Sequence, residues 1–334
     1  MKVAIVGASG AVGQEFLRVL DERNFPIDEL LLFGSARSAG RKYTFRGKEI
    51  EVKLLQHNDD FKGVDIAFTS AGGGTSIEFA ETITKYGAVM IDNSSAFRME
   101  NDVPLVVPEV NAEDALNRPR NIIANPNCTT IITLMALYPL HLKYGLKTIV
   151  ASSYQAVSGS GQHGITELEN QVRAIVDGHP VEIKTYPRQI AFNVLPQIDK
   201  FADNGYTKEE LKMLNEGRKI MSLPELNVTC TCVRVPVYRS HSISCIAQFE
   251  KPVDVEGARS CYDGMPGVEL MDDVANNVWP TPLDSTNGDT CYVGRIRKDI
   301  AIDNALNLWV VGDQVRKGAA LNAVQIAELL VKGK

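Results

Sequence analysis

Cys128 occupies a position in the chain that suits nucleophilic chemistry. It lies in the run Asn125-Pro126-Asn127-Cys128-Thr129-Thr130, after a β-rich stretch and before an apolar helical pattern over residues 131–141. The positive end of a helix dipole and the free amides at a helix start lower a thiol pKa and favour the thiolate. Cys128 is therefore the candidate nucleophile. The other cysteines have no activating neighbour and are expected to be structural: Cys230, Cys232, Cys245, Cys261 and Cys291.

His241 is the candidate acid/base group that accompanies this thiol. It follows a predicted strand and a turn in the run Arg234-Val235-Pro236-Val237-Tyr238-Arg239-Ser240-His241-Ser242. An imidazole placed there is expected to take the thiol proton and later return it. The remaining histidines lie in ordinary polar settings, and no His, Cys and Asp cluster has metal-ligand spacing, so no metal is expected.

Glu216 and Lys219 lie three residues apart in a predicted helix over residues 207–221, so both project from one face. The helix has a start signal, because Thr207 followed by Glu210 forms a capping box. Two readings of the pair stay open. It is either a surface ion pair or a pair of charges that faces an ionic substrate.

A glycine-rich loop near the N-terminus predicts a dinucleotide site. Gly7-Ala8-Ser9-Gly10-Ala11-Val12-Gly13 follows a predicted strand and opens a predicted helix. Backbone amides and the positive helix end are placed there to hold a pyrophosphate. The spacing is GxxGxxG rather than GxGxxG, and a tight turn without a ligand is the alternative.

The next predicted strand ends in a sequence that favours NADP over NAD. An NAD site usually has an acidic residue about 20 residues on, which binds the ribose 2′-hydroxyl. This chain instead has Ser35, Arg37 and Ser38 in the run Phe33-Gly34-Ser35-Ala36-Arg37-Ser38-Ala39-Gly40. Two hydroxyls and a guanidinium suit a 2′-phosphate. The alternative is that Arg37 and Arg41 are solvent-exposed side chains of a surface loop and bind no ligand.

The elements that position these residues follow an α/β pattern. Strands are predicted at residues 3–6, 30–33, 66–70, 89–92 and 122–125, with helices such as 13–21 and 76–86 between them. Strand and helix alternating at this spacing are typical of βαβ units and a Rossmann-type, doubly wound, mostly parallel sheet.

From about residue 148 the pattern changes. Longer strands are predicted at residues 148–155, 226–236, 242–249 and 290–297, separated by helices at 161–176 and 207–221. This order indicates an α+β domain with an antiparallel or mixed sheet. A last helix, over residues 317–331, is expected to return to the first domain. The predicted division is 1–128 with 316–334, and 129–315.

Composition fits a folded protein of two domains and limits its partners. The 334 residues are 23% charged and 44% hydrophobic, with a formal net charge of -6. This charge gives no reason to expect nucleic acid or an anionic membrane as partner. No stretch reaches the roughly 18 apolar residues of a membrane span, and no secretory signal is evident, so a cytoplasmic location is expected. The cysteines fit a reducing compartment.

Several short motifs, in order along the chain, resemble those of the aspartate-semialdehyde dehydrogenases. They are GASGAVG, ARSAG, SSAFR, NPNCTT, SYQAVSGSG, the ExxK helix, RVPVYRSHS and KGAALNAVQIAE. The resemblance covers essentially the whole length. It implies a cofactor domain, a substrate and dimerisation domain, and a homodimer. It also implies reversible NADPH-dependent reduction of aspartyl phosphate through a cysteine thioester, a step toward lysine, threonine and methionine.

The resemblance also implies roles for individual residues. Cys128 would be the acyl-thioester nucleophile, His241 the acid/base and Gln155 the residue that orients the acyl group. Arg98, Asn127 and Lys219 would bind phosphate, while Arg234 would bind the substrate carboxylate and Glu216 its ammonium group. Ser158 and Gly159 would line the nicotinamide pocket with Gln314 nearby. An acyl phosphate with a carboxylate and an ammonium does require cationic and anionic groups together.

Three other classes of protein remain as alternatives. N-acetyl-glutamyl-phosphate reductase uses the same thioester chemistry, but its acetylated substrate has no ammonium for Glu216 to bind. A Cys/His hydrolase or acyltransferase would need no nicotinamide, which the glycine loop argues against. A non-enzymatic NADP sensor would have no need of both Cys128 and His241.

Overall fold

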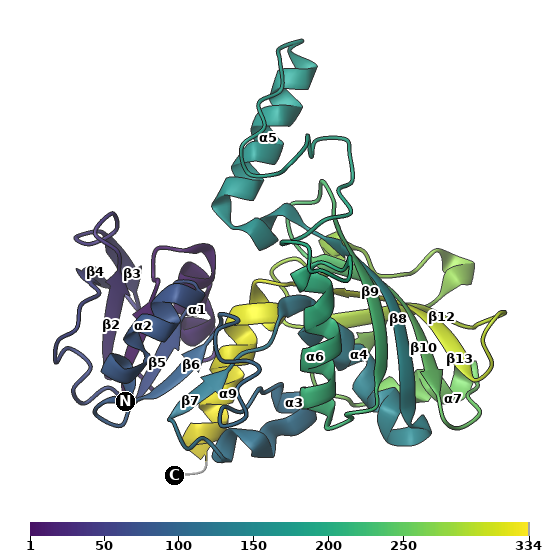
Figure 1. Ribbon diagram of the computed structural model, residues 1–334, viewed down its shortest axis with the longest axis horizontal. Coiled ribbons are helices and arrows are strands. Elements are labelled where there is room, and N and C mark those ends of the chain that lie inside the picture. Colours follow the sequence, from purple (N-terminus) through teal and green to yellow (C-terminus); the bar gives the residue numbers. More distant parts are fainter. Residues whose placement is uncertain (333–334) are drawn as a thin grey trace. The chain divides into compact units, whose positions relative to one another are not determined.

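The computed structural model describes residues 1–332. The chain divides into two compact units, which we call the first and the second unit. The first comprises Met1–Asn127 and the chain from Ala319 onward, and the second comprises Cys128–Gly318. Each unit is built on its own sheet (Figure 1).

The first unit contains a seven-stranded sheet in the order β3-β4-β2-β1-β5-β6-β7. Neighbouring strands are parallel except for the antiparallel pair β3 and β4. Its strands are β1 (Lys2–Val6), β2 (Glu29–Gly34), β3 (Lys42–Phe45), β4 (Lys48–Leu54), β5 (Ile66–Thr69), β6 (Val89–Asp92) and β7 (Ile122–Ala124). The strand order reverses between β1 and β5, where a doubly wound sheet opens a crevice for a ligand.

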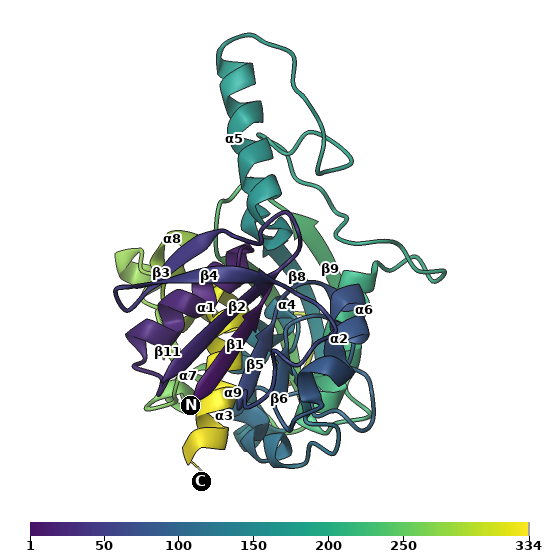
Figure 2. The same ribbon diagram turned by 90° about the vertical axis from the view of Figure 1, so that its left-hand side faces the viewer.

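Helices cover both faces of this sheet. Right-handed crossovers leave β1 and β5 in opposite directions, so α1 (Ala11–Glu22) and α2 (Gly73–Thr84) lie on opposite faces. The C-terminal helix α9 (Leu321–Lys332) packs with α1, and Phe16, Ile5 and Val324 share one buried core. A short helix α3 (Pro108–Asn111) and a 3₁₀ turn η1 (Ala112–Leu116) complete the unit (Figure 2).

The second unit contains a six-stranded mixed sheet in the order β11-β12-β13-β10-β8-β9. The pairs β8–β9 and β11–β12 are parallel and the others are antiparallel. Its strands are β8 (Leu146–Gln155), β9 (Asn227–Arg234), β10 (His241–Phe249), β11 (Val268–Leu270), β12 (Cys291–Lys298) and β13 (Ala305–Gly312).

Two long helices pack against this sheet, α4 (Cys128–Tyr144) and α6 (Lys208–Met221). A third, α5 (Gln162–Val176), extends beyond the end of the sheet with the loop that follows it (Figures 1 and 2). The unit also contains the short helices and turns η2 (Val157–Ser160), α7 (Val255–Arg259), η3 (Ser260–Tyr262), η4 (Val274–Asn276) and α8 (Pro282–Ser285). A π-helical turn η5 (Arg316–Ala320) leads into α9.

The start of α6 confirms a prediction made from sequence. The Thr207 side chain accepts a hydrogen bond from the Glu210 amide at 3.3 Å. The Glu210 carboxylate in turn accepts the Thr207 amide at 2.7 Å, which completes the capping box. This local rule fixes where the helix begins.

Most predicted elements are present, with ends that differ by a few residues. The expected last helix is regular only from Leu321, because residues 316–320 form the π-helical turn, and residues 333–334 lie outside the described part. Sequence reasoning did not name β3, β4, β11 or β13. The β3–β4 hairpin is largely exposed and rich in charged residues, so it has no continuous apolar run. Within residues 1–332, no helix is long and apolar enough to cross a membrane.

Candidate active site

Cys128 is the first residue of α4, at the helix start near which the sequence placed it, and it is partly exposed and forms no disulfide. The N-terminal end of the helix therefore lies at the sulfur, where it stabilises negative charge. Gly318 packs directly against this residue. A Cβ at Gly318 would lie 2.7 Å from the Cys128 Cβ, so only glycine leaves room for the cysteine. Gly318 belongs to the KGAALNAVQIAE motif, but the sequence alone did not predict this contact.

His241 is the first residue of β10 and is fully buried. Its Nδ1 accepts a hydrogen bond from the Ala156 amide at 3.1 Å. Its Nε2 is buried and has no hydrogen-bond partner among residues 1–332. An amide donating to Nδ1 means that the neutral ring holds its proton on Nε2. The structure thus presents Nε2–H as an unused donor.

Burial, and after it the nearby Arg234 guanidinium, holds the pKa of His241 well below its ordinary value. The imidazole is therefore neutral at physiological pH. Accepting the thiol proton at Nε2 would require the other tautomer, whose Nδ1–H would face the Ala156 amide. The sequence suggested that His241 both accepts and donates a proton. The geometry supports His241 as a hydrogen-bond donor from Nε2.

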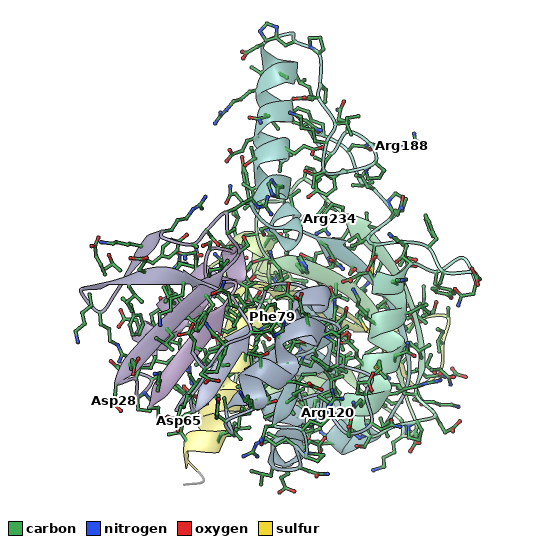
Figure 3. The ribbon with its side chains drawn as sticks, turned by 60° about the vertical axis from the view of Figure 1, so that its left-hand side comes forward. Asp28, Asp65, Phe79, Arg120, Arg188 and Arg234 are labelled. Atoms are coloured by element: carbon green, nitrogen blue, oxygen red, sulfur yellow. The ribbon has the colours of Figure 1, made fainter. Side chains whose placement is uncertain are left out.

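Arg234 is the last residue of β9 and is buried next to this histidine. Its Nη1 donates to the Ala156 carbonyl at 2.6 Å, so the backbone of Ala156 holds both Arg234 and His241. Burial lowers the pKa of Arg234, and the nearby Tyr186 and Cys128 act in the opposite direction. Arg234 therefore lies within electrostatic range of the candidate nucleophile. Figure 3 shows it at the foot of α5.

Ser158, Gly159 and Gln314 surround this pair. A Cβ at Gly159 would lie 2.8 Å from Arg234 Nη1 and 3.4 Å from His241 Nε2. Gln314 donates from Nε2 to the Ser158 hydroxyl and accepts the Ser240 amide at 2.8 Å. The glycine leaves space in front of the imidazole, and the glutamine joins the η2 turn to the start of β10.

Gln155 ends β8 and is buried. Its side-chain amide donates to the Ser153 hydroxyl and to Glu209 Oε1, each at 3.2 Å. Glu209 lies in the first turn of α6 and also pairs with Lys212 at 2.9 Å. The amide group of Gln155 is thus oriented by an acidic residue that sequence reasoning did not name.

Glu216 and Lys219 both lie on α6. Glu216 is only 2% exposed, so the reading of the two residues as a surface ion pair is wrong for the carboxylate. Lys219 is partly buried. A carboxylate is buried at low cost only where cations or hydrogen-bond donors surround it.

Arg98 and Asn127 belong to the first unit, and both are largely buried. The Arg98 guanidinium donates to the Asn125 carbonyl and to the Asn93 carbonyl, each at 2.9 Å. Asn125 is held in turn by Asn322, whose amide donates to it at 2.7 Å. In the NPN motif, Asn125 therefore has a structural role, because it joins Arg98 and Asn322. Asn127, the second asparagine of the motif, directly precedes Cys128.

The glycine loop of the first unit fits a bound pyrophosphate. Gly7 has φ +87°, and a Cβ there would lie 2.4 Å from the Ser70 carbonyl oxygen. A Cβ at Gly13 would lie 2.3 Å from the Gly7 carbonyl oxygen. Gly10 supplies no side chain to cap α1, which begins at Ala11 and continues through Val12. The Ser9 hydroxyl is buried without a hydrogen-bond partner in the described part of the chain, as expected for a group that binds a ligand.

The loop after β2 has no acidic residue between Ser35 and Gly40. Ser35 and Arg37 are exposed. Ser38 is buried, and its hydroxyl donates to the Ser35 carbonyl at 3.1 Å. Of the three residues predicted to bind a 2′-phosphate, two present their side chains to solvent while Ser38 shapes the loop.

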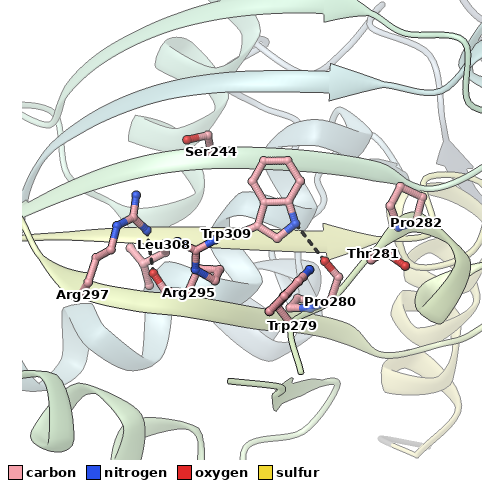
Figure 4. Close-up of a pocket in the computed structure, with 9 residues that line it drawn as sticks. All are labelled: Ser244, Trp279, Pro280, Thr281, Pro282, Arg295, Arg297, Leu308 and Trp309. Carbon is pink, nitrogen blue, oxygen red and sulfur yellow. Dashed lines mark hydrogen bonds between the residues drawn. The ribbon is translucent and has the colours of Figure 1, made fainter. Parts of the chain in front are cut away.

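Two cavities lie in the second unit. One, of about 160 Å³, is bordered by Arg234, Tyr186, Ser160 and Asp199. The other, of about 310 Å³, lies on the sheet face that carries Ser244 and Trp309 (Figure 4). There the Trp309 indole donates to the Pro280 carbonyl at 2.9 Å. None of its nine lining residues is a predicted site residue. The first cavity is bordered by one predicted site residue, Arg234.

The structure thus brings together the predicted site residues that border Arg234 in the second unit. Gly159 lies against Arg234 and His241, its neighbour Ser158 is hydrogen-bonded to Gln314, and Gln314 and Cys128 both lie against Gly318. Sequence reasoning missed Ala156, Glu209 and Gly318, whose importance depends on contacts between distant segments. In the part of the chain from Met1 to Lys332, no group of three or more His, Cys, Asp or Glu residues is placed to hold a metal ion.

Comparisons with known proteins identify the family. Residues 2–118 match the model of the semialdehyde dehydrogenase NAD binding domain, and residues 137–317 match the semialdehyde dehydrogenase dimerisation domain. The aspartate-semialdehyde dehydrogenase of Aquifex aeolicus is 54% identical over 99% of this chain and 98% of its own length.

Solved structures agree with this result. Aspartate semialdehyde dehydrogenase II of Vibrio cholerae, described as complexed with ASA, matches with a TM-score of 0.96 and 48% identity, over 99% of this chain and 98% of its own. The enzyme of Candida albicans, described as containing NADP, matches with a TM-score of 0.76 and 25% identity, over 98% of each chain. The chain belongs to the aspartate-semialdehyde dehydrogenase family.

Proposed function

We propose that this protein catalyses the reversible, NADPH-dependent conversion of L-aspartyl 4-phosphate to L-aspartate 4-semialdehyde and phosphate. The observation that carries the proposal is the group formed by Cys128, Arg234 and His241, with a buried Glu216 on α6. Family membership and the ASA complex of the Vibrio cholerae relative support the same substrate. The product aldehyde serves the biosynthesis of lysine, threonine and methionine.

Cys128 attacks the acyl carbon as a thiolate, forms a thioester and releases phosphate. The N-terminal end of α4 and the Arg234 guanidinium stabilise the negative sulfur. The thiol is partly exposed, so its proton can pass to water. When bound, the nicotinamide supplies the hydride that reduces the acyl carbon.

His241 acts in this proposal as a hydrogen-bond donor from Nε2. Each exchange at the acyl carbon passes through a tetrahedral centre whose oxygen carries negative charge. The Nε2–H group has no acceptor among the residues that the structure describes and is buried, so a hydrogen bond to that oxygen is strong. Collapse of the centre re-forms the carbonyl and expels the sulfur as thiolate, which leaves the proton on Nε2.

The remaining roles are assigned by charge. Arg234 binds the substrate carboxylate and Glu216 its ammonium group. Arg98, Asn127 and Lys219 bind phosphate, and Gln155 orients the acyl group. Gly7, Ser9, Gly10, Ala11, Val12 and Gly13 hold the pyrophosphate of the cofactor, with Ser158, Gly159 and Gln314 toward the nicotinamide.

The two units divide these tasks in the same proposal. Residues 1–128 with the C-terminal helix serve the cofactor, and residues 129–315 serve the substrate and a homodimer. The second cavity is lined by the exposed Trp279, helix α8 beside it carries the exposed Leu283, and both residues lie within the stretch that matches the dimerisation domain. Sedimentation of the purified protein gives the mass of the assembly.

The test of the proposed activity measures NADPH formation by absorbance, with phosphate and one of two aldehydes. We expect phosphate-dependent turnover of aspartate semialdehyde and none of N-acetyl-glutamate semialdehyde. Turnover of the acetylated aldehyde would instead assign the sister activity and remove the role of Glu216. If neither aldehyde reacts, the proposed activity is wrong, although the cofactor fold remains.

We further propose that NADP is preferred over NAD because Arg37 binds the 2′-phosphate. The loop after β2 is without an acidic group and exposes this guanidinium, and NADP is present in the Candida albicans relative. Arg37→Ala is expected to raise KM for NADP about 10- to 100-fold, since a hydrogen bond to a charged group contributes roughly 1.5–3 kcal/mol, while KM for NAD stays unchanged. Arg41→Ala, in the same loop, is the control. Equal changes for both cofactors would contradict the assignment.

A further inference from the structure

Ser240, directly before His241, has an unusual backbone conformation. Its φ is +73°, in the left-handed region that a residue with a Cβ rarely adopts. It is also fully buried. Such a conformation persists only where the surrounding structure imposes it. The groups that hold Ser240 therefore also fix the backbone from which the imidazole projects.

Three consecutive residues at the end of β13 bind the three residues 239–241. Gly312 pairs with His241 in the β10–β13 ladder. Asp313 Oδ2 accepts from Arg239 Nε at 2.6 Å. Gln314 Oε1 accepts the Ser240 amide at 2.8 Å. The strained residue is thus held from both sides by one segment.

Asp313 is the fixed member of this arrangement. Its carboxylate is fully buried and accepts three backbone amides besides Arg239. These are the amides of Asn287 at 2.7 Å, Val315 at 2.9 Å and Arg316 at 3.1 Å. A carboxylate with this many donors has almost no freedom to move, so it can serve as an anchor for Arg239.

We propose that Asp313 is a positioning residue for His241. Through Arg239, and beside the bond from Ser240 to Gln314, its carboxylate holds Ser240 in the left-handed conformation that directs His241 Nε2 toward the acyl group. The inference rests on the proposed function, because it assigns a task to His241. Asp313 itself touches neither His241 nor the substrate in this scheme.

The test compares Asp313→Asn with and without Ser240→Gly. Glycine adopts positive φ readily, so it relieves the conformation that Asp313 otherwise enforces. The Thr286 hydroxyl, which contacts Ser240 at 3.1 Å, still donates to the Pro282 carbonyl at 2.7 Å in the glycine variant. Asp313→Asn is expected to lower kcat about tenfold, the effect of roughly 1.4 kcal/mol, with KM for aspartate semialdehyde unchanged. Adding Ser240→Gly is expected to restore most of kcat.

Asp272→Asn is the matched control. The Asp272 side chain is also buried, pairs with Arg259 at 3.0 Å and accepts the amides of Arg295 at 2.7 Å and Ile296 at 3.1 Å. Asp272→Asn should lower the melting temperature to about the same extent as Asp313→Asn and leave kcat unchanged. Arg239→Gln, which removes the pair but keeps the amide bonds of Asp313, replaces Asp313→Asn if that variant does not fold.

The possible results distinguish a failure of the Asp313 positioning role from a failure of the proposed activity. Equal losses of kcat in Asp313→Asn and Asp272→Asn, or no recovery with Ser240→Gly, would overturn the positioning role while native turnover stands. An absence of native turnover on aspartate semialdehyde would overturn the proposed function, and this inference with it.

Discussion

Cys128→Ser is expected to lower turnover of aspartate semialdehyde by at least about 10³-fold, because a hydroxyl at this position is far less nucleophilic than a thiolate. In the proposed mechanism, the N-terminal end of α4 and the Arg234 guanidinium stabilise the negative charge on sulfur. They cannot bring a serine hydroxyl, with its much higher intrinsic pKa, to the same ionisation. The change is nearly isosteric, so KM should change little. The measurement is steady-state NADPH formation with phosphate present.

Cys261→Ser is the matched control for this prediction. Cys261 is the other partly exposed cysteine of the described chain, and its thiol donates to the Gly257 carbonyl at 3.2 Å. Burial raises the pKa of this thiol, so it is not a competing nucleophile. Its replacement should leave turnover unchanged. Equal rates for native protein and Cys128→Ser would exclude Cys128 as nucleophile.

Trapping the intermediate gives a second measurement. With aspartate semialdehyde and NADP but no phosphate, the acyl enzyme should accumulate, because the group that accepts the acyl from sulfur is missing. Mass spectrometry is expected to find the added acyl mass on the peptide that contains Cys128, and not in the Cys128→Ser variant. Acyl mass on another cysteine would contradict the mechanism.

The second large effect concerns His241. Removing the imidazole with His241→Ala is expected to lower kcat about 10²- to 10³-fold, the usual effect of losing one oxyanion donor. His241→Gln should recover part of this loss, about tenfold, because its amide nitrogen can donate from near the position of Nε2 but cannot transfer a proton at neutral pH. The measurement is kcat for both variants with aspartate semialdehyde.

The comparison of these two variants decides between donor and base. If His241 must accept the thiol proton, glutamine and alanine will be equally slow, and the donor role is wrong. His141→Gln is the control, since His141 also accepts a backbone amide at Nδ1, from Leu146 at 3.1 Å, and burial also lowers its pKa. It lies on α4 away from the group around Arg234 and should leave kcat unchanged.

Features of the chain that obey short-range rules were predictable from the sequence. The glycine loop predicted the strand, turn and helix that meet at Gly7–Gly13, because glycine is needed where backbone segments nearly touch. The capping box at Thr207 fixed the start of α6. The start of α4 at Cys128 followed from the change from a β-rich run to helical periodicity.

Other elements were not predicted. The β3–β4 hairpin does carry a local signal, because charged or polar residues alternate with apolar ones as in a half-buried strand, but each run is short and largely exposed. Strand β13 is a short apolar run, and such a run does not by itself distinguish a strand from a buried helical segment. Its partners β10 and β12 decide its conformation.

The sequence by itself determined the two-domain α/β architecture, the nucleophile at a helix start and the identity of the charged residues available for a substrate. Only the tertiary structure decided which nitrogen of His241 is available, because the Ala156 amide comes from another strand end. The tertiary structure also decided that Glu216 is buried, that Gly159 and Gly318 leave space for their neighbours, and that Asp313 accepts a hydrogen bond from Arg239. Each depends on atoms that meet only after distant segments pack, and no local pattern of residues encodes that proximity.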